Sequence, residues 1–180
     1  IVAHQAGDAD AARREYRAAL DIAPDNPDAL HFMGLLTVEA GDVDEGMRLI
    51  RRSLRVHPAN PGALNNLGNT LRAAGDVEGA LRAYRDALAN VPDHRETLFN
   101  LSGLLVAEAR SEEALQVIDR ALSLDPANEQ LRRQRAGCLL QTGRRDEAVA
   151  LLEDKESIFD YSSYLYRESL SLALRALQGE

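Results

Sequence analysis

The stretch HPANPGALNNLGNTLRAAGD, residues 57–76, decides the fold because it contains a helix together with the signals that start and stop it. Leu64 and Leu67 begin a series of apolar residues at helical spacing on one face. Gly75 and Asp76 then end the segment, since glycine adopts the left-handed conformation that stops a helix and aspartate caps the helix that follows. The stretch predicts the first helix of a pair.

A second amphipathic segment begins at Val77 and ends near Pro92. Its apolar residues also keep helical spacing: Val77, Ala80, Leu81, Tyr84, Ala87 and Leu88. A helical hairpin of this kind cannot bury both of its faces alone, so it must stack on further copies of itself.

Those further copies are visible in the spacing of prolines and glycines. Prolines recur every 34 residues, at Pro24, Pro58, Pro92 and Pro126. Glycines do the same at Gly7, Gly41, Gly75 and Gly143, with Ala109 in the one gap. A fixed period of this length indicates a repeat array.

The repeated residues resemble the tetratricopeptide repeat (TPR) family, in a bacterial type of array. Its pattern is carried by Leu64, Leu67, Gly68, Leu71, Ala80, Tyr84 and Pro92. Neighbouring copies carry it at Leu30, Met33, Gly34, Thr37, Gly46, Ile50 and Pro58, and at Leu98, Leu101, Ser102, Leu105, Ala114, Ile118 and Pro126. The resemblance implies an all-α fold, a right-handed superhelical solenoid of antiparallel helix pairs.

Small residues in this pattern are expected where two helices approach closely. They are Gly34, Gly68, Ala80 and Ala114, and a large side chain at such a contact overpacks it at a cost of about 1–3 kcal/mol.

The period predicts an array over residues 1–155 and an extra helix over residues 156–180. The expected copies are a truncated first repeat (1–26), three full repeats (27–60, 61–94, 95–128) and a degenerate last repeat (129–155). The cut first copy predicts that the native protein continues upstream.

Two features of the last part of the chain leave alternatives open. Arg132 and Arg135 stand where leucines stand in the third copy, which indicates a loosened repeat or a basic spot for an acidic partner. The helix over 156–180 has one apolar stripe and a second flanking one. It is expected to cap the array, and the alternatives are a homodimer contact or docking onto a downstream domain.

The resemblance also indicates where a ligand binds, because the first helix of each TPR pair lines a concave groove. Three series of groove positions follow at 34-residue steps: Phe32, Asn66, Asn100, Gln134; His31, Asn65, Phe99, Arg133; and Leu35, Asn69, Gly103, Gly137. We therefore expect Asn65, Asn66 and Asn69 to face the open groove.

An amide side chain offers a donor and an acceptor, as a peptide bond does, so evenly spaced amides can hold a peptide backbone. This arrangement partly resembles the asparagine ladder in the repeat domain of O-linked N-acetylglucosamine transferases. Asn66 and Asn100 match that series, Gln134 is a longer amide and Phe32 departs from it. The alternative is that the asparagines form hydrogen bonds between repeats.

Other groove positions differ in chemistry. Phe99 would add an apolar anchor, and Arg72 and Arg133 are the basic groove candidates. No lysine accompanies them, so the clamp by which other members of the family hold a terminal carboxylate is not expected.

Charge and composition exclude several classes of function. The net charge of −8 argues against nucleic acid as a partner, and the arginines are spread without a block of like charge, as on solvated helix faces. No apolar run is long enough to insert into a membrane. The single Cys138 excludes an intrachain disulfide and is expected to be a buried structural thiol. The compartment stays undetermined, with the cytoplasm favoured.

No catalytic motif, metal site or cofactor site is expected. His4, His31, His57 and His94 fall in different repeats, without the i, i+4 pairing of a helical zinc site. The prediction is a non-catalytic protein–protein interaction module that binds a peptide or partner helix in the groove. The alternative is a substrate-recognition segment of a larger multidomain enzyme, such as a glycosyltransferase, which the full-length gene sequence would distinguish.

Overall fold

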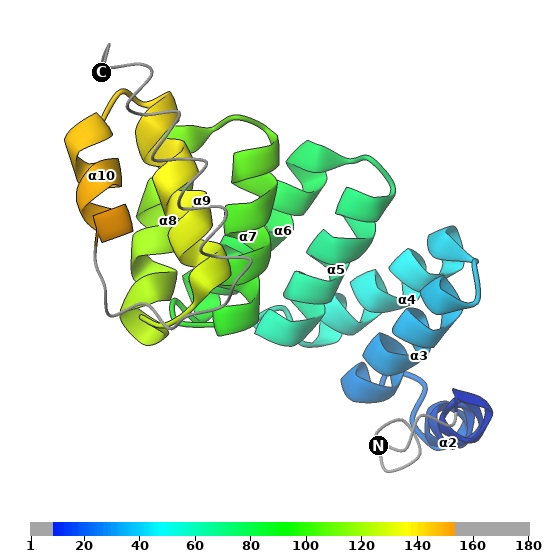
Figure 1. Ribbon diagram of the computed structural model, residues 1–180. Helices are drawn as coiled ribbons and strands as arrows, with labels where there is room; N and C mark the ends of the chain where they lie inside the picture. The colour runs from blue at the N-terminus through cyan, green and yellow to red at the C-terminus, as the bar shows by residue number, and fades with distance from the viewer. Residues whose placement is uncertain (1–8, 154–180) are drawn as a thin grey trace. The chain divides into compact units, whose positions relative to one another are not determined.

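The computed structural model describes residues 9–153, and every regular element within that range is an α-helix. The helices are α2 (Ala9–Ile22), α3 (Pro27–Glu39), α4 (Val43–Val56), α5 (Pro61–Ala73), α6 (Val77–Asn90), α7 (Arg95–Ala107), α8 (Ser111–Leu124), α9 (Glu129–Gln141) and α10 (Arg145–Glu153) (Figure 1). The start of the truncated first repeat and the helix expected over 156–180 lie outside the described residues.

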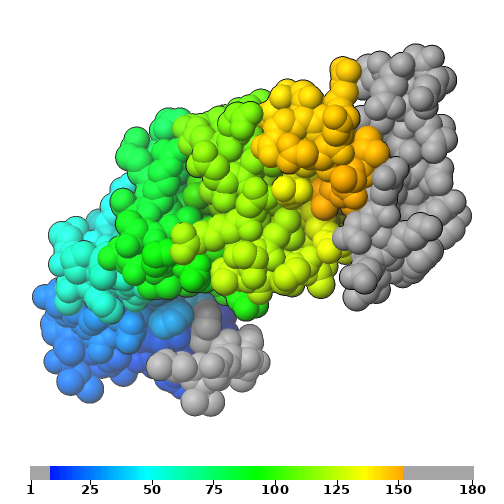
Figure 2. All heavy atoms as spheres, turned by 90° about the vertical axis from the view of Figure 1, so that its left-hand side faces the viewer, coloured from blue at the N-terminus to red at the C-terminus, as the bar shows by residue number. Residues whose placement is uncertain are grey.

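The chain divides into two compact units, residues 1–97 and 98–180, and the division falls near the start of α7. In unit 1, α3 packs against α4 and α5 against α6, while α3 also contacts α5. In unit 2, α9 packs against both α8 and α10. Within each unit, the surfaces of successive segments follow one another in chain order (Figure 2). The all-α helical repeat predicted from the 34-residue period is confirmed.

The same tight turn occurs four times, directly before the first helices α3, α5, α7 and α9. Pro24, Pro58, Pro92 and Pro126 each occupy the second position of the turn, where their fixed φ is already suitable. The turn closes when the N–H of the fourth residue donates to the first carbonyl, as Asn60 does to His57 at 3.3 Å.

The fourth residue of the same turn also caps the helix. Asn26, Asn60 and Asn128 accept a hydrogen bond from the N–H three residues on, at 2.9, 3.0 and 3.1 Å. A side-chain acceptor here satisfies one of the free N–H groups at a helix start. The asparagines of this turn therefore serve the fold.

A second kind of turn joins the two helices of each pair and needs a positive φ. Gly41, Gly75 and Gly143 adopt φ values of +96°, +82° and +77°, as predicted for a left-handed stop. Ala109 fills the gap in this series and still adopts φ +54°. The turn geometry is therefore kept where glycine is not.

The close helix contacts explain the small residues of the pattern. A Cβ atom added to Gly68 would lie 2.5 Å from Tyr84 Cε1, and one added to Gly34 would lie 2.8 Å from Ile50 Cγ1. Ala80 and Ala114 are fully buried. At Gly34 and Gly68 the facing side chain leaves no room for a larger residue.

Candidate functional site on the first helices

A chain of polar side chains in unit 1 connects α3 and α5 and continues to Thr97, the last residue of the unit. Asn66 Nδ2 lies 3.0 Å from His31 Nε2, so the amide donates to an unprotonated ring nitrogen. Asn65 Nδ2 donates to Asn66 Oδ1 at 3.5 Å, and the Thr97 hydroxyl donates to Asn65 Oδ1 at 3.2 Å. The Thr97 oxygen in turn lies 2.8 Å from His94 Nδ1. Every donor in this chain points toward His31.

His31 is the most constrained member of that chain. Its side chain is 5% exposed and its ring stacks on Phe32 at a centroid distance of 4.8 Å. Burial lowers the pKa of His31, against the smaller opposing effect of the Asp28 charge. A neutral ring is what the hydrogen bond from Asn66 requires.

The expectation that Asn65 faces an open groove is wrong. Its side chain is 2% exposed and is held by Thr97 and Asn66. Thr97 was not singled out in the sequence, although it interrupts the equivalent series Ala29, Ala63 and Leu131 with a hydroxyl. The hydroxyl at position 97, one repeat along from Asn65, is therefore the sequence signal for a hydrogen-bond partner of Asn65.

Asn66 and Asn69 are partly exposed, and both already make hydrogen bonds within the fold. Asn66 binds His31, and the Tyr84 hydroxyl donates to Asn69 Oδ1 at 2.7 Å. These amides therefore combine a structural role with a surface that solvent reaches.

In unit 2, Phe99, Asn100 and Gln134 are partly exposed on the first helices α7 and α9. The single hydroxyl hydrogen of Ser102 is shared between the Phe99 carbonyl at 2.8 Å and Gln134 Oε1 at 3.3 Å, so the amide nitrogen of Gln134 is left for another acceptor.

Two glycines on the same helices are not required by close packing among residues 9–153. Within that range a Cβ atom added to Gly137 would have no neighbour closer than 4 Å, and one added to Gly103 would meet Gln134 Nε2 at 3.7 Å. These positions differ from Gly34 and Gly68, where the same atom would collide. Helix backbone is thus open to approach at Gly103 and Gly137.

The basic groove candidates are exposed. Arg133 lies on α9 and Arg72 on α5. Burial raises the pKa of Tyr84, and the charge of Arg72 opposes this rise to a lesser extent.

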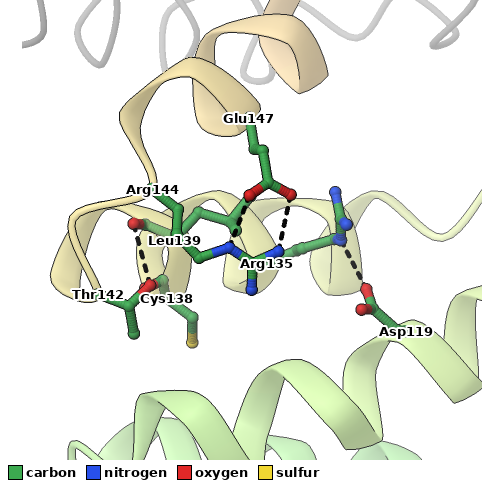
Figure 3. A network of polar contacts seen from close by, with 7 residues as sticks. All are labelled: Asp119, Arg135, Cys138, Leu139, Thr142, Arg144 and Glu147. Carbon is green, nitrogen blue, oxygen red and sulfur yellow. Dashed lines mark hydrogen bonds and ion pairs between the residues drawn. The ribbon is translucent and has the colours of Figure 1, made fainter.

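By contrast, Arg132 and Arg135, which replace leucines in the last repeat, form hydrogen bonds within unit 2. Arg135 Nε donates to Asp119 Oδ1 on α8 at 2.6 Å, and Arg132 Nε donates to the Pro126 carbonyl at 2.9 Å. Arg144 forms a two-point ion pair with Glu147 beside Arg135, each bond 2.7 Å long (Figure 3). The hydrogen bonding from Arg144 lowers the pKa of Glu147 most, and the charges of Arg144 and Arg135 lower it further. Arg135 thus belongs to a charge cluster that connects α8, α9 and α10.

Cys138 is a free thiol with 1% exposure, as expected for a structural cysteine. Burial raises its pKa, which a hydrogen bond with Ser111 opposes. The thiol is therefore held in its unreactive protonated form.

Between residues 9 and 153, no group of three or more histidine, cysteine or acidic side chains is placed to hold a metal ion. The same part of the chain has no helix long and apolar enough to cross a membrane.

A stack of antiparallel helix pairs with a partly polar first-helix face defines the class of helical-repeat interaction modules. Family models described as tetratricopeptide repeat match residues 33–95 and 67–129, and a further one matches residues 105–154. The chain belongs to the tetratricopeptide repeat family.

Solved structures of the same fold come from several proteins. A structure described as the functional characterization of Pseudomonas aeruginosa pilF is 19% identical, with a TM-score of 0.76, over 98% of this chain and 80% of that one. YrrB, described as a TPR protein with an unusual peptide-binding site, is 19% identical, with a TM-score of 0.74, over 93% of this chain and 87% of that one. A crystal structure of MamA is 18% identical, with a TM-score of 0.73, over 95% of each chain. None of the curated protein sequences compared with the chain matches it.

Proposed function

We propose that the chain is a non-catalytic interaction module that binds a peptide or an extended segment of a partner protein on its first-helix face. The observation that carries this proposal is the pair of open glycines, Gly103 and Gly137. Glycine in a helix interior costs roughly 0.5–1 kcal/mol relative to alanine. Packing among the described residues of unit 2 does not require it at either position, and contact with a ligand backbone would.

The side chains around those glycines have the chemistry that such a ligand needs. Phe99 offers an apolar surface, the Gln134 amide nitrogen offers a donor, and Arg133 offers an exposed charge. In unit 1, Asn66 and Asn69 present partly exposed amides. Membership of the TPR family supports protein or peptide partners in general.

The test is a capture experiment with the full chain, its Gly103→Ala/Gly137→Ala variant and mass spectrometry of the bound proteins. The added methyl groups have room, so the variant should be as stable as the parent or more stable by up to about 1 kcal/mol per site. At the same time it should lose the captured partners.

This combination, higher stability with weaker binding, separates a binding surface from a structural one. Gly62→Ala is the matched control, because it lies in unit 1 and its added Cβ would meet only the Asn60 side chain, at 3.4 Å. Partners that remain bound to the double variant would refute the proposed surface. Asn66→Ala is less suitable as a probe, because it also removes the partner of the buried His31.

A further inference from the structure

Six arginines recur in register on the second helices of unit 1. They form two rows at 34-residue spacing, which we call the arginine rows: Arg14, Arg48 and Arg82, and Arg17, Arg51 and Arg85. Each helix α2, α4 and α6 contributes one arginine to each row.

The helix geometry places both rows on the outer face. In each helix the arginines lie two and five residues after a fully packed small residue: Ala12, Gly46 or Ala80. At about 100° per residue, these steps place the arginines roughly opposite that residue. The residue four positions after it, Tyr16, Ile50 or Tyr84, lies on the packed side and is buried. All six arginines are exposed accordingly.

Most of these charges are not used by the part of the fold that the structure describes. The guanidinium groups of Arg14, Arg17, Arg51 and Arg82 form no hydrogen bond or ion pair with any residue between 9 and 153. Arg48 differs, because it holds Glu45 through two hydrogen bonds. In each helix an acid precedes the arginine of the first row by four residues, at Asp10, Asp44 and Glu78, so the six arginines of the rows outnumber these three acids.

The pattern ends with unit 1. In α8 the two equivalent positions are Gln116 and Asp119, and in α10 the first of them is Ala150. The repeat fold itself therefore does not require arginine there, since the same helix pair forms without it.

From this placement we propose that the arginine rows bind an acidic segment of a partner protein that crosses α2, α4 and α6. Guanidinium groups bind carboxylates through paired hydrogen bonds, and a chain crossing the three helices meets two of them on each. The net charge of −8 disfavours a long polyanion or an anionic bilayer, which would face much of the molecule. A short segment interacts only with the charges near it, because salt screens charges beyond about 8 Å at physiological ionic strength.

The probe is a fluorescein-labelled peptide of alternating glutamate and serine, about twenty residues long so that it can span several helices. Its binding to the full chain is measured by fluorescence anisotropy at low and at physiological salt. The parent should bind at low salt and release the peptide as salt is added. The test variant is Arg14→Gln/Arg17→Gln/Arg51→Gln/Arg82→Gln, which removes no hydrogen bond of the fold between residues 9 and 153.

The control variant carries the same change of charge at exposed arginines outside both the rows and the first-helix binding surface: Arg95→Gln/Arg120→Gln/Arg144→Gln/Arg145→Gln. The test variant should lower the affinity at least about tenfold, since it removes four exposed charge pairs at once, and the control should change it by no more than about twofold. Equal losses in both variants, or no binding by the parent at low salt, would overturn the proposal. Tighter binding of a single-stranded oligonucleotide or of phosphatidylserine vesicles through the same arginines would overturn the choice of a protein segment.

Discussion

Ala109 shows how a single residue can conflict with the turn it occupies. Its φ of +54° lies in the left-handed region, where an L-residue other than glycine is strained by roughly 1–2 kcal/mol. The three equivalent positions that lie in the described range are glycines with similar φ values.

Ala109→Gly should therefore raise the unfolding free energy by about 1 kcal/mol, because glycine relieves the strain at the cost of some chain entropy. Thermal melts of the two proteins measure this. The control is Ala18→Gly, an exposed position in the interior of α2 at which glycine should lower the stability by roughly 0.5–1 kcal/mol. A loss of stability in both variants would contradict the account of the turn.

His31 makes stability depend on pH. Unfolded histidine takes up a proton near its ordinary pKa of about 6.5, whereas the buried ring resists until the pH reaches its lowered folded pKa. Between these two values the unfolded state binds more protons, so the unfolding free energy falls as the pH drops through that window. Protonation would also set a ring N–H against the amide N–H of Asn66.

We expect the melting temperature to fall on acidification from about pH 7.5 to about pH 5.5, around the ordinary histidine pKa, and part of that fall to disappear in His31→Asn. The asparagine is the residue that the third repeat carries at this position, Asn65. His57→Asn, at an exposed turn, is the control for the loss of a histidine as such. An unchanged pH dependence in His31→Asn would mean that other groups cause it.

At the scale of helices, the same residue type serves two purposes. Gly68 allows α5 to approach the ring of Tyr84, whereas a methyl group at Gly137 in α9 would contact no atom of the described part of the chain.

Gly68→Ala should lower the unfolding free energy by about 1–3 kcal/mol, since the added Cβ forces the Tyr84 ring to move. Chemical denaturation followed by circular dichroism gives the value, and Gly137→Ala serves as the control that should lose none. A larger residue at position 68, such as leucine, should damage the fold further. Equal behaviour of the two alanine variants would show that the helix contact is softer than the geometry implies.

The helix pairs were predictable from the sequence because their start and stop signals are local. Pro58 and Gly75 each favour the backbone conformation found at their own position, and the same residues recur in other copies at 34-residue spacing. The burial of Asn65 was not predictable in the same way. It depends on the Thr97 hydroxyl in the next repeat, while the equivalent Arg133 is exposed. Residues at equivalent positions of different repeats can differ in burial, because the burial of each also depends on the residue that the next repeat packs against it.

At the scale of the whole molecule, the two units use different chemistry at equivalent positions. Asp42 and Asp76 cap the second helices of unit 1, where each accepts a hydrogen bond from a backbone N–H. Arg110 and Arg144 replace them in unit 2 and bind Glu113 and Glu147 instead. Since exposed ion pairs contribute little, unit 2 gives up part of the capping energy of unit 1.

Destabilisation should therefore remain local along the array. In a repeat protein each copy contacts only its neighbours, so Gly68→Ala should reduce amide protection in α5 and α6 more than in α8 and α9. Native-state hydrogen exchange with mass spectrometry resolves these helices. A uniform loss of protection over residues 9–153 would show that the array unfolds as one cooperative unit.

The single buried thiol gives this array a built-in reporter. Cys138 is the only cysteine in the chain, and its side chain is 1% exposed in α9. A thiol reagent can modify it only when the fourth and fifth repeats separate around it. The labelling rate, divided by the rate of an unprotected thiol, thus gives the equilibrium constant for that opening when reclosing is fast. The last repeats of the array can be followed in this way in the unmutated protein.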